Sequence, residues 1–121
     1  MTPDEAPELV VTESRPRPGV RVLRPVGVVD LRTAPLLGSS VREHAADHSD
    51  RLVLDLAGVR LLAAAGVALV VTVQRELRDR LLVTGVRGNP AVERVLELTG
   101  TRDRLEIHDD LDAVLDRLDP G

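Results

Sequence analysis

Hydrophobic and polar residues along the first quarter of the chain follow a pattern that indicates a β-hairpin. Residues 9–12 are apolar and mostly β-branched, and residues 20–23 alternate between apolar and basic side chains. The segment between them, residues 16–19, carries the prolines and the glycine that turns favour. We therefore predict two antiparallel strands joined by a turn.

A helix is predicted to follow the hairpin and to lead into a buried strand. Thr33 is its expected N-cap, and Pro35 stands in its first turn, where a missing N–H costs little. The inward face is indicated by residues at spacings of four, four and three: Leu37, Val41, Ala45 and His48. Residues 51–56 form a nearly continuous apolar run, which is typical of a central strand covered on both faces.

The longest apolar run, residues 61–73, predicts a buried helix. It is shorter than the ~20 residues that span a bilayer. The helix is expected to run from Ala64 to about Arg80, apolar all round in its first half and polar in its second. Its N-terminal end should then be buried and its C-terminal end should reach solvent. Residues 81–86 predict another apolar strand.

The C-terminal third of the chain predicts a helix, a short strand and a last helix. Asn89 and Pro90 are the expected N-cap and first residue of a helix that ends at Gly100. Its inward stripe consists of Val92, Val95, Leu96 and Thr99. Residues 105–107 form the short strand, and Asp109 or Asp110 caps the last helix. The inward residues of that helix are Leu111, Val114, Leu115 and Leu118.

These segments give the element order β-β-α-β-α-β-α-β-α. Strands that alternate with helices indicate the α/β class, here a mixed, mostly parallel sheet flanked by helices in a single domain. We expect that domain to span residues 9–118, after a disordered lead-in over residues 1–8.

Composition narrows the functions that such a domain can have. The chain has no Phe, Tyr, Trp or Cys, and its formal net charge is −4. Single-stranded nucleic acid is usually held by stacking on aromatic rings, and a phosphate backbone needs basic protein surface, so nucleic-acid binding is not expected. The lack of cysteine excludes disulfides, thiolate metal sites and a cysteine nucleophile. With a polar, acidic start and no membrane span, the expected location is the cytoplasm.

Three segments together resemble the STAS domain family, typified by bacterial anti-anti-sigma factors. PVGVVDLRTA at residues 25–34 resembles the family's G-x-x-D-x-x-T segment after the second strand. LVLDLAGV at residues 52–59 resembles its strand and turn, V-L-D-L-S-G-V. NPAVERVLELTG at residues 89–100 resembles its third helix, which ends in L-x-x-T/S-G. The resemblance covers residues 9–118 and rests on all three segments being in register.

The resemblance implies a protein-binding role without catalysis. Such proteins capture an anti-sigma factor, often a serine kinase of the histidine-kinase ATPase fold, and so release a sigma factor. The kinase switches them off by phosphorylating a Ser or Thr in a D-S-S-G-like turn that begins the second helix. Here the matching residues are Ala63, Ala64, Ala65 and Gly66, so Ala64 stands where the phosphorylated residue would be.

Two roles follow for a chain without a hydroxyl at this turn. It is either an antagonist that is always active, or a protein outside that circuit that serves as a scaffold or regulatory subunit of a transporter or stress-signalling complex. All three polar positions differ from the family, which favours natural divergence over an engineered change. The expected contact face consists of the turn with Asp30 and Thr33, although one of these two residues can instead cap the first helix. The oligomeric state stays open.

Other candidate residues have simpler interpretations. His44 and His48, with Asp47 nearby, lack a third metal ligand and are expected to be ordinary helix residues. The segment from His108 to Asp110 is expected to cap a helix rather than form an acid–base site.

Ser39 and Ser40 should be polar-face residues. Gly85, Gly88 and Asn89 should shape a loop, since no phosphate-binding pattern is present. The basic cluster of Arg15, Arg17, Arg21 and Arg24 fits a solvated hairpin better than a patch for an acidic partner. With no nucleophile–base pair, we expect no catalysis and no cofactor.

Overall fold

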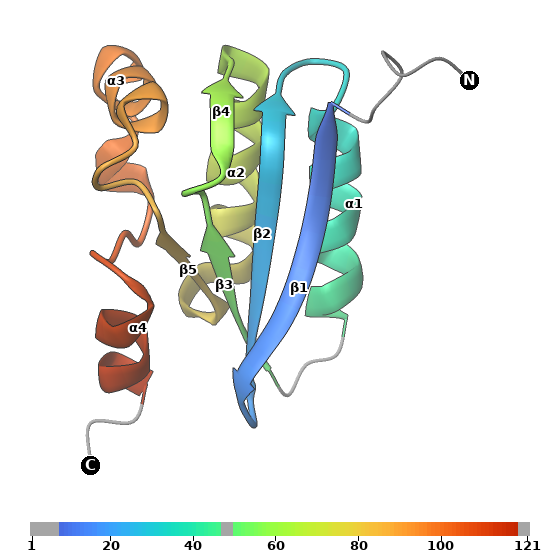
Figure 1. The fold of residues 1–121 in the computed structure, drawn as a ribbon, viewed down its shortest axis with the longest axis vertical. Helices are drawn as coiled ribbons and strands as arrows, with labels where there is room; N and C mark the ends of the chain where they lie inside the picture. The colour runs from blue at the N-terminus through green and yellow to red at the C-terminus, as the bar shows by residue number, and fades with distance from the viewer. Residues whose placement is uncertain (1–7, 47–49, 119–121) are drawn as a thin grey trace.

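Nine regular elements and two short 3-10 turns make up the part of the chain that the computed structural model describes, residues 8–46 and 50–118. The strands are β1 (Leu9–Arg17), β2 (Val20–Val29), β3 (Arg51–Asp55), β4 (Val59–Leu62) and β5 (Leu81–Thr84). The helices are α1 (Ala34–Ala45), α2 (Ala64–Leu77), α3 (Pro90–Thr99) and α4 (Leu111–Leu118) (Figure 1). The 3-10 turns are η2 (Arg78–Arg80) and η3 (Arg102–Arg104).

Parts of the sequence-based predictions fall outside the described residues. They are most of the expected lead-in, residues 1–7, and His48 with its neighbour Asp47. Glu8, which we expected in the lead-in, is described: its carbonyl accepts the N–H of Val28 at 2.9 Å.

The five strands form one mixed sheet. Four of them lie in the order β1-β2-β3-β5, and β4 pairs with β2 beyond the end of β3. The β1–β2 pair is antiparallel, whereas β2–β3, β2–β4 and β3–β5 are parallel. The predicted hairpin and the predicted mostly parallel sheet with flanking helices are therefore confirmed.

On the edge away from β1, strand β2 pairs first with β3 and then with β4. Residues 20–23 pair with β3, and residues 27–29 pair with β4. Pro25 lies between the two ladders, where its missing N–H removes no bond from either. After it, the N–H of Gly27 donates to the carbonyl of Gly58 at 3.0 Å. Because of this change, β2 and β4 end side by side at the top of the sheet in Figure 1.

Alternating side chains of the sheet supply two cores. Leu23, Leu52, Leu54, Leu81 and Val83 belong to the larger core, which also contains the buried residues of α1, α2 and α3. Their neighbours in sequence, Val22, Val53 and Leu82, face the opposite side and pack with Val114 of α4. This period of two is the pattern of strands covered on both faces. Helices α1 and α2 lie behind the sheet in Figure 1.

The element order differs from the prediction in two places: β4 is an additional strand before α2, and no strand lies in the described residues between α3 and α4. Residues 59–62 form β4, although we had assigned Leu61 and Leu62 to the helical apolar run. Residues 105–107, predicted as a strand, make only an isolated bridge between Ile107 and Val83. The side-chain amide of Asn89 stabilises the tight turn before β4, because it donates to the carbonyls of Leu56 and Val59, both at 2.9 Å.

Two burial predictions were wrong. Helix α2 is not buried only at its N-terminal end: its buried stripe runs along the whole helix and consists of Gly66, Val67, Val70, Val73 and Gln74. Ala64 and Ala68, on its other side, are exposed. In α3, Thr99 is exposed instead of inward, and its hydroxyl donates to the carbonyl of Val95 at 2.7 Å.

Candidate functional site

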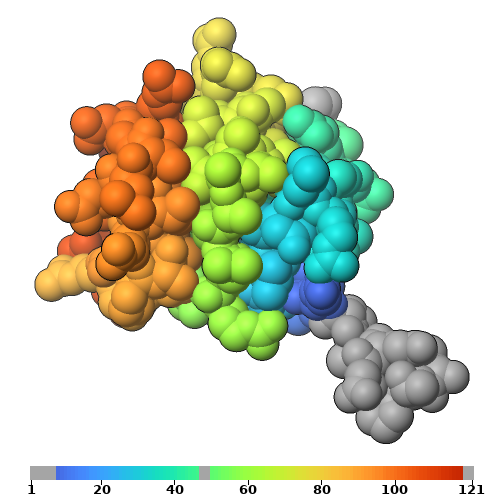
Figure 2. Space-filling model, turned by 90° about the horizontal axis from the view of Figure 1, so that it is seen from above, coloured from blue at the N-terminus to red at the C-terminus, as the bar shows by residue number. Residues whose placement is uncertain are grey.

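The two segments that the sequence singled out meet at the top of the sheet. Val29 at the end of β2 pairs with Leu62 at the end of β4, and the N–H of Ala63 donates to the carbonyl of Val29 at 2.8 Å. The loop of residues 30–33 and the first turn of α2 therefore leave the sheet as neighbours. Seen from above, these segments and α3 share one face of the molecule (Figure 2).

Asp30 caps the turn that leads into α1. Its Oδ1 accepts the N–H groups of Arg32 at 3.0 Å and Thr33 at 3.1 Å, and its carbonyl accepts the N–H of Ala34 at 2.8 Å. The Thr33 hydroxyl bonds back to the loop: its oxygen accepts the N–H of Asp30 at 2.9 Å, and its O–H donates to the carbonyl of Val28 at 2.8 Å. This mutual bonding follows the logic of a capping box. Thr33, the predicted N-cap, makes no side-chain cap bond of its own.

The hydrogen bonds and ion pairs of the loop favour the charged forms of Asp30 and Arg32. The N–H of Thr33 lowers the pKa of the Asp30 carboxyl, with a further contribution from the N–H of Arg32, against the desolvation that raises it. Arg32 contacts the carboxylate of Glu8, which together with Asp30 raises the pKa of its guanidinium. The loop is therefore held by internal bonds, and Asp30 has a capping role whether or not it also meets a partner.

The first turn of α2, which we call the α2 tip, consists of Ala63, Ala64, Ala65 and Gly66. Ala63 occupies the N-cap position with an extended backbone, φ −81° and ψ 171°, and makes no side-chain cap bond. Ala64 is exposed and Ala65 is half-buried. The tip therefore presents methyl groups and the unbonded N–H groups of a helix start, with no hydroxyl or carboxylate.

Gly66 lets the α2 tip lie directly on the strand ends. A Cβ atom at this position would stand 2.7 Å from Val29 Cγ1 and Leu62 Cδ1, and 3.0 Å from the carbonyl oxygen of Val29. The glycine is thus required by the packing of the helix on β2 and β4.

Two exposed leucines, which sequence reasoning missed, lie in the 30–33 loop and near the end of β4. Leu31 in the loop is 78% exposed, and Leu61 near the end of β4 is 50% exposed. Large apolar side chains at such exposure are a mark of interaction surfaces when they cluster. The signal for Leu31 was present in the sequence as a leucine inside a polar turn, whereas Leu61 was hidden by the mistaken helical assignment.

The histidines do not form a metal site within residues 8–46 and 50–118. His44 bonds through Nδ1 to the carbonyl of Ser40 at 2.7 Å and through Nε2 to the Glu13 carboxylate at 2.8 Å. His108 Nε2 lies 3.5 Å from Glu106, and its backbone N–H donates to Val83. No group of three potential metal ligands occurs in this part of the chain.

The remaining candidates have structural roles. Asp110 caps α4, because its Oδ1 accepts the N–H of Ala113 at 2.8 Å, and Asp109 pairs with Arg87 at 3.1 Å. Ser39 is exposed on α1, and Ser40 is half-buried. Gly85 adopts φ +78° in the loop after β5.

Acidic residues accompany the arginines of the hairpin. Arg15 and Arg21 both reach Asp50, at 3.4 and 3.1 Å. Arg24 pairs with Asp55 at 2.7 Å. The cluster is therefore largely neutralised within the fold, which does not favour a basic patch.

The fold and the α2 tip define a class of small α/β domain that presents a loop and a helix start at one end of its sheet. A family model described as "Mlab, STAS domain" matches residues 15–117. The chain therefore belongs to the STAS domain family, which is typically non-catalytic. No curated protein matches it. Within the described residues, no helix is long and apolar enough to cross a membrane.

Three solved structures illustrate the relationship. An anti-sigma factor antagonist from Mycobacterium paratuberculosis is 28% identical, with 96% of each chain covered and a TM-score of 0.79. The antagonist SpoIIAA in its unphosphorylated form is 16% identical, with 93% of this chain and 98% of that chain covered and a TM-score of 0.72. The phosphorylated form of the Bacillus cell fate determinant SpoIIAA is 16% identical, with coverages of 90% and 99% and a TM-score of 0.64. At 16% identity, the SpoIIAA structures support the shared fold alone.

Proposed function

We propose that this STAS domain is an anti-sigma factor antagonist whose α2 tip and 30–33 loop form its contact face, and that phosphorylation of the tip does not regulate it. The observation that carries the proposal is the exposed methyl group of Ala64 at the start of α2, beside a loop that carries the exposed Leu31. The 28% identical Mycobacterium antagonist, matched over 96% of both chains, supports the choice of partner class.

The physical argument concerns charge at a contact surface. A phosphorylated serine or threonine adds about −1.5 to −2 charges and three acceptor oxygens. A helix N-terminus tolerates that charge, but burying it against a partner costs desolvation. Alanine has no oxygen that can accept a phosphoryl group. Ala64 therefore keeps the tip neutral and apolar under all signalling conditions.

The same face contains no acid–base machinery. In residues 30–33 and 63–66 the only ionisable side chains are those of Asp30 and Arg32, and both are engaged in hydrogen bonds. Proton transfer or nucleophilic attack needs a free group of suitable pKa near a substrate. The face is suited to binding a protein surface.

The direct test is calorimetry of the chain against the anti-sigma factors encoded in the same genome, with and without ATP. We expect binding that ATP does not change, and a loss of at least tenfold in affinity, about 1.4 kcal/mol, for Ala64→Glu. Ala46→Glu is the matched control, since Ala46 is also exposed and lies at the C-terminal end of α1, away from the tip. Failure to bind any anti-sigma factor, while a transport ATPase or a stress-signalling complex does bind, would replace this proposal by the scaffold role.

A further inference from the structure

A trough runs along α2 on the side that faces α3 and η3. One hollow of about 340 Å³ lies beside Ala64 and Ala68, and a second of about 630 Å³ lies beside Arg78 and Glu106. The two hollows share Val71, Arg75 and Arg104 in their linings. Together they accompany α2 from its first turn to its end, a length of roughly 20 Å at 1.5 Å per residue. We call this surface the α2–α3 trough.

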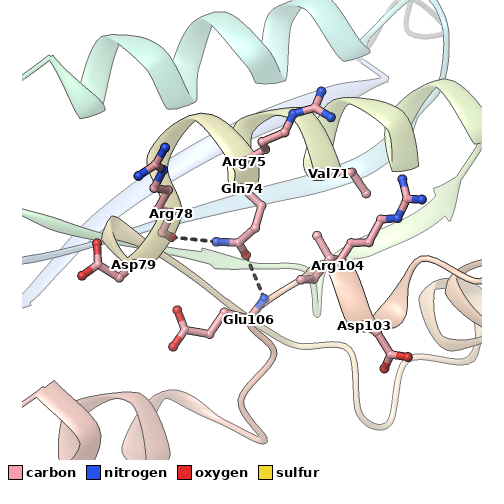
Figure 3. A pocket seen from close by; sticks show the side chains of 9 residues that line it. Val71, Gln74, Arg75, Arg78, Asp79, Asp103, Arg104 and Glu106 are labelled. Atoms are coloured by element: carbon pink, nitrogen blue, oxygen red, sulfur yellow. Dashed lines mark hydrogen bonds between the residues drawn. The ribbon is translucent and has the colours of Figure 1, made fainter.

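The buried side chain of Gln74 fixes the shape of the trough. Its Nε2 donates to the carbonyls of Arg78 and Leu81, both at 2.8 Å. Its Oε1 accepts the N–H of Glu106 at 2.9 Å, which ties α2 to the segment after η3 (Figure 3). Since the amide is fully bonded within the fold, the trough exists before any ligand arrives.

The lining combines a small apolar floor with unpaired positive charge. Ala64 and Ala68 are exposed and stand one helical turn apart, and Val71 continues the floor. Arg75 and Arg104 flank this floor; both are exposed, and neither makes a side-chain hydrogen bond or ion pair with any residue in 8–46 or 50–118. No carboxylate lines the 340 Å³ hollow. Arg75 and Arg104 are therefore the only charged side chains among the described residues that line this hollow.

The acidic residues of the trough lie only around the second hollow. They are Asp79, Asp103 and Glu106, and the Glu106 carboxylate already bonds Arg117 at 3.0 Å. The 340 Å³ hollow beside Ala64 thus has two arginines as its charged side chains, whereas the 630 Å³ hollow, which the same arginines also line, adds Arg78 and the three acidic residues. An occupant that matches this arrangement has apolar residues at one end and carboxylates in its middle.

We infer that the α2–α3 trough docks an amphipathic acidic helix of the protein partner. Alanines at positions i and i+4 allow a second helix to approach closely, and a groove of this length suits a helix that places carboxylates beside Arg75 and Arg104. The inference rests on the proposed function, because the trough begins at Ala64 and so continues the proposed contact face. A nucleotide fits less well, since the chain has no aromatic residue for base stacking.

The test uses the isolated protein and three synthetic helices of roughly 15 residues, stapled because shorter free helices are marginal in water. One carries leucines on one face and glutamates in the middle of its flank, the second carries lysines in place of the glutamates, and the third is a scramble of the first. Binding is followed by amide chemical shifts of the labelled protein and by calorimetry. The acidic helix should bind at least tenfold more tightly than the other two and shift the resonances of α2, α3 and η3.

Charge reversal supplies the matched variants. Arg75→Glu with Arg104→Glu should weaken the acidic helix at least tenfold and strengthen the lysine helix. Arg94→Glu, at an exposed arginine of α3 outside the trough, should leave both affinities within twofold. Equal binding of the acidic helix and its scramble, shifts confined to another surface, or an equal loss in Arg94→Glu would overturn the inference. None of these outcomes involves an anti-sigma factor, so the Ala64→Glu test of the proposed function stands separately.

Discussion

At the scale of single residues, Gly66 connects the α2 tip to the sheet. Its Cα–H faces Val29 and Leu62 so closely that a methyl group would meet the Val29 carbonyl oxygen at 3.0 Å. Neither a backbone carbonyl nor a β-branched side chain moves easily, so the helix itself would have to shift.

Gly66→Ala should therefore destabilise the domain by about 1–3 kcal/mol, the usual cost of overpacking. Gly38→Ala is the control, because the Cβ at that α1 position meets the flexible Leu69 and Arg42 side chains and alanine is the better helix former. Urea denaturation of both variants measures the difference. A Gly66→Ala protein as stable as the Gly38→Ala protein would show that the tip does not lie on the strand ends as described.

Arg78 holds a backbone conformation that an L-residue rarely adopts. It is the C-cap of α2, with φ 53° and ψ −124°, and its carbonyl accepts the bond from Gln74. Arg78→Gly should raise the free energy of unfolding by about 0.5–1 kcal/mol, since relief of strain exceeds the added freedom of the unfolded glycine. Arg75→Gly, inside the helix, should instead lower it by about 1 kcal/mol. Thermal unfolding of the two variants shows whether their stabilities change in opposite directions. A lower stability in both variants would argue against strain at Arg78.

Asp30 predicts a pH dependence with a defined sign. Its pKa is lowered in the fold from an ordinary value of 3.8, chiefly by the N–H of Thr33. A lowered folded-state pKa means that the carboxylate stabilises the protein above pH 3.8 and that this contribution is lost as the pH falls toward the folded-state pKa.

Asp30→Asn keeps an acceptor oxygen but cannot titrate. We expect the variant to be less stable than the parent at pH 7, with the gap closing as the pH is lowered below about 4. Asp116→Asn, at an exposed carboxylate of α4, is the matched control. Urea midpoints measured from pH 3 to 7 decide the matter; a gap that stays constant with pH would mean that the Thr33 bond does not stabilise the charge.

At the scale of elements, α2 begins without a side-chain cap. Ala63 has the extended backbone of an N-cap residue, yet a methyl group cannot accept the N–H groups of the first turn. The neutral tip is therefore less stable than the same backbone would be with a serine.

Ala63→Ser should stabilise the domain by about 1 kcal/mol, in the range found for N-caps. Ala68→Ser, at an exposed position further along the same helix, should cost a few tenths of a kcal/mol, roughly the difference in helix propensity. Denaturation midpoints of the two variants test this. Equal effects would indicate that water caps the helix as well as a hydroxyl does.

The elements that the sequence predicted well are those with clear periodicity and terminal signals. Gly100, for example, ends α3 in the left-handed conformation at φ 64°. Strand β4 could not be predicted, because its four residues follow a tight turn and merge with the apolar start of α2. Thr33 occupies the predicted N-cap position, but the side-chain bonds of the turn come from Asp30, which the sequence could not show because both residue types serve as caps and only the turn geometry selects one.

At the scale of the molecule, the two faces of the sheet are covered unequally. Helices α1, α2 and α3 share the larger core, whereas α4 covers Val20, Val22, Val53 and Leu82 on the other face. Val10 and Val26, paired with each other on β1 and β2, remain 45% exposed. The tip and the trough lie on the helical side, so a partner that binds there leaves the exposed valines free.

The arginines of the hairpin and those beside the trough differ in whether they form ion pairs. The hairpin arginines are neutralised by Asp50 and Asp55, while Arg75 and Arg104 beside the trough are not paired with any described residue. A chain of net charge −4 therefore still presents a hollow beside the apolar tip whose only charged side chains, among the described residues, are two arginines. Local complementarity of this kind guides the choice and orientation of a partner more than net charge does.

Amide hydrogen exchange of the domain, free and bound to the anti-sigma factor that we propose as its partner, tests the docking face most directly. Binding at the α2 tip should slow the exchange of residues 30–33 and 61–68, since the unbonded N–H groups of the first turn become covered by the partner. Exchange in β1 and α4 should stay unchanged. Protection that falls on the β1–β2 surface around Val10 and Val26, with the tip exchanging as in the free protein, would contradict the account.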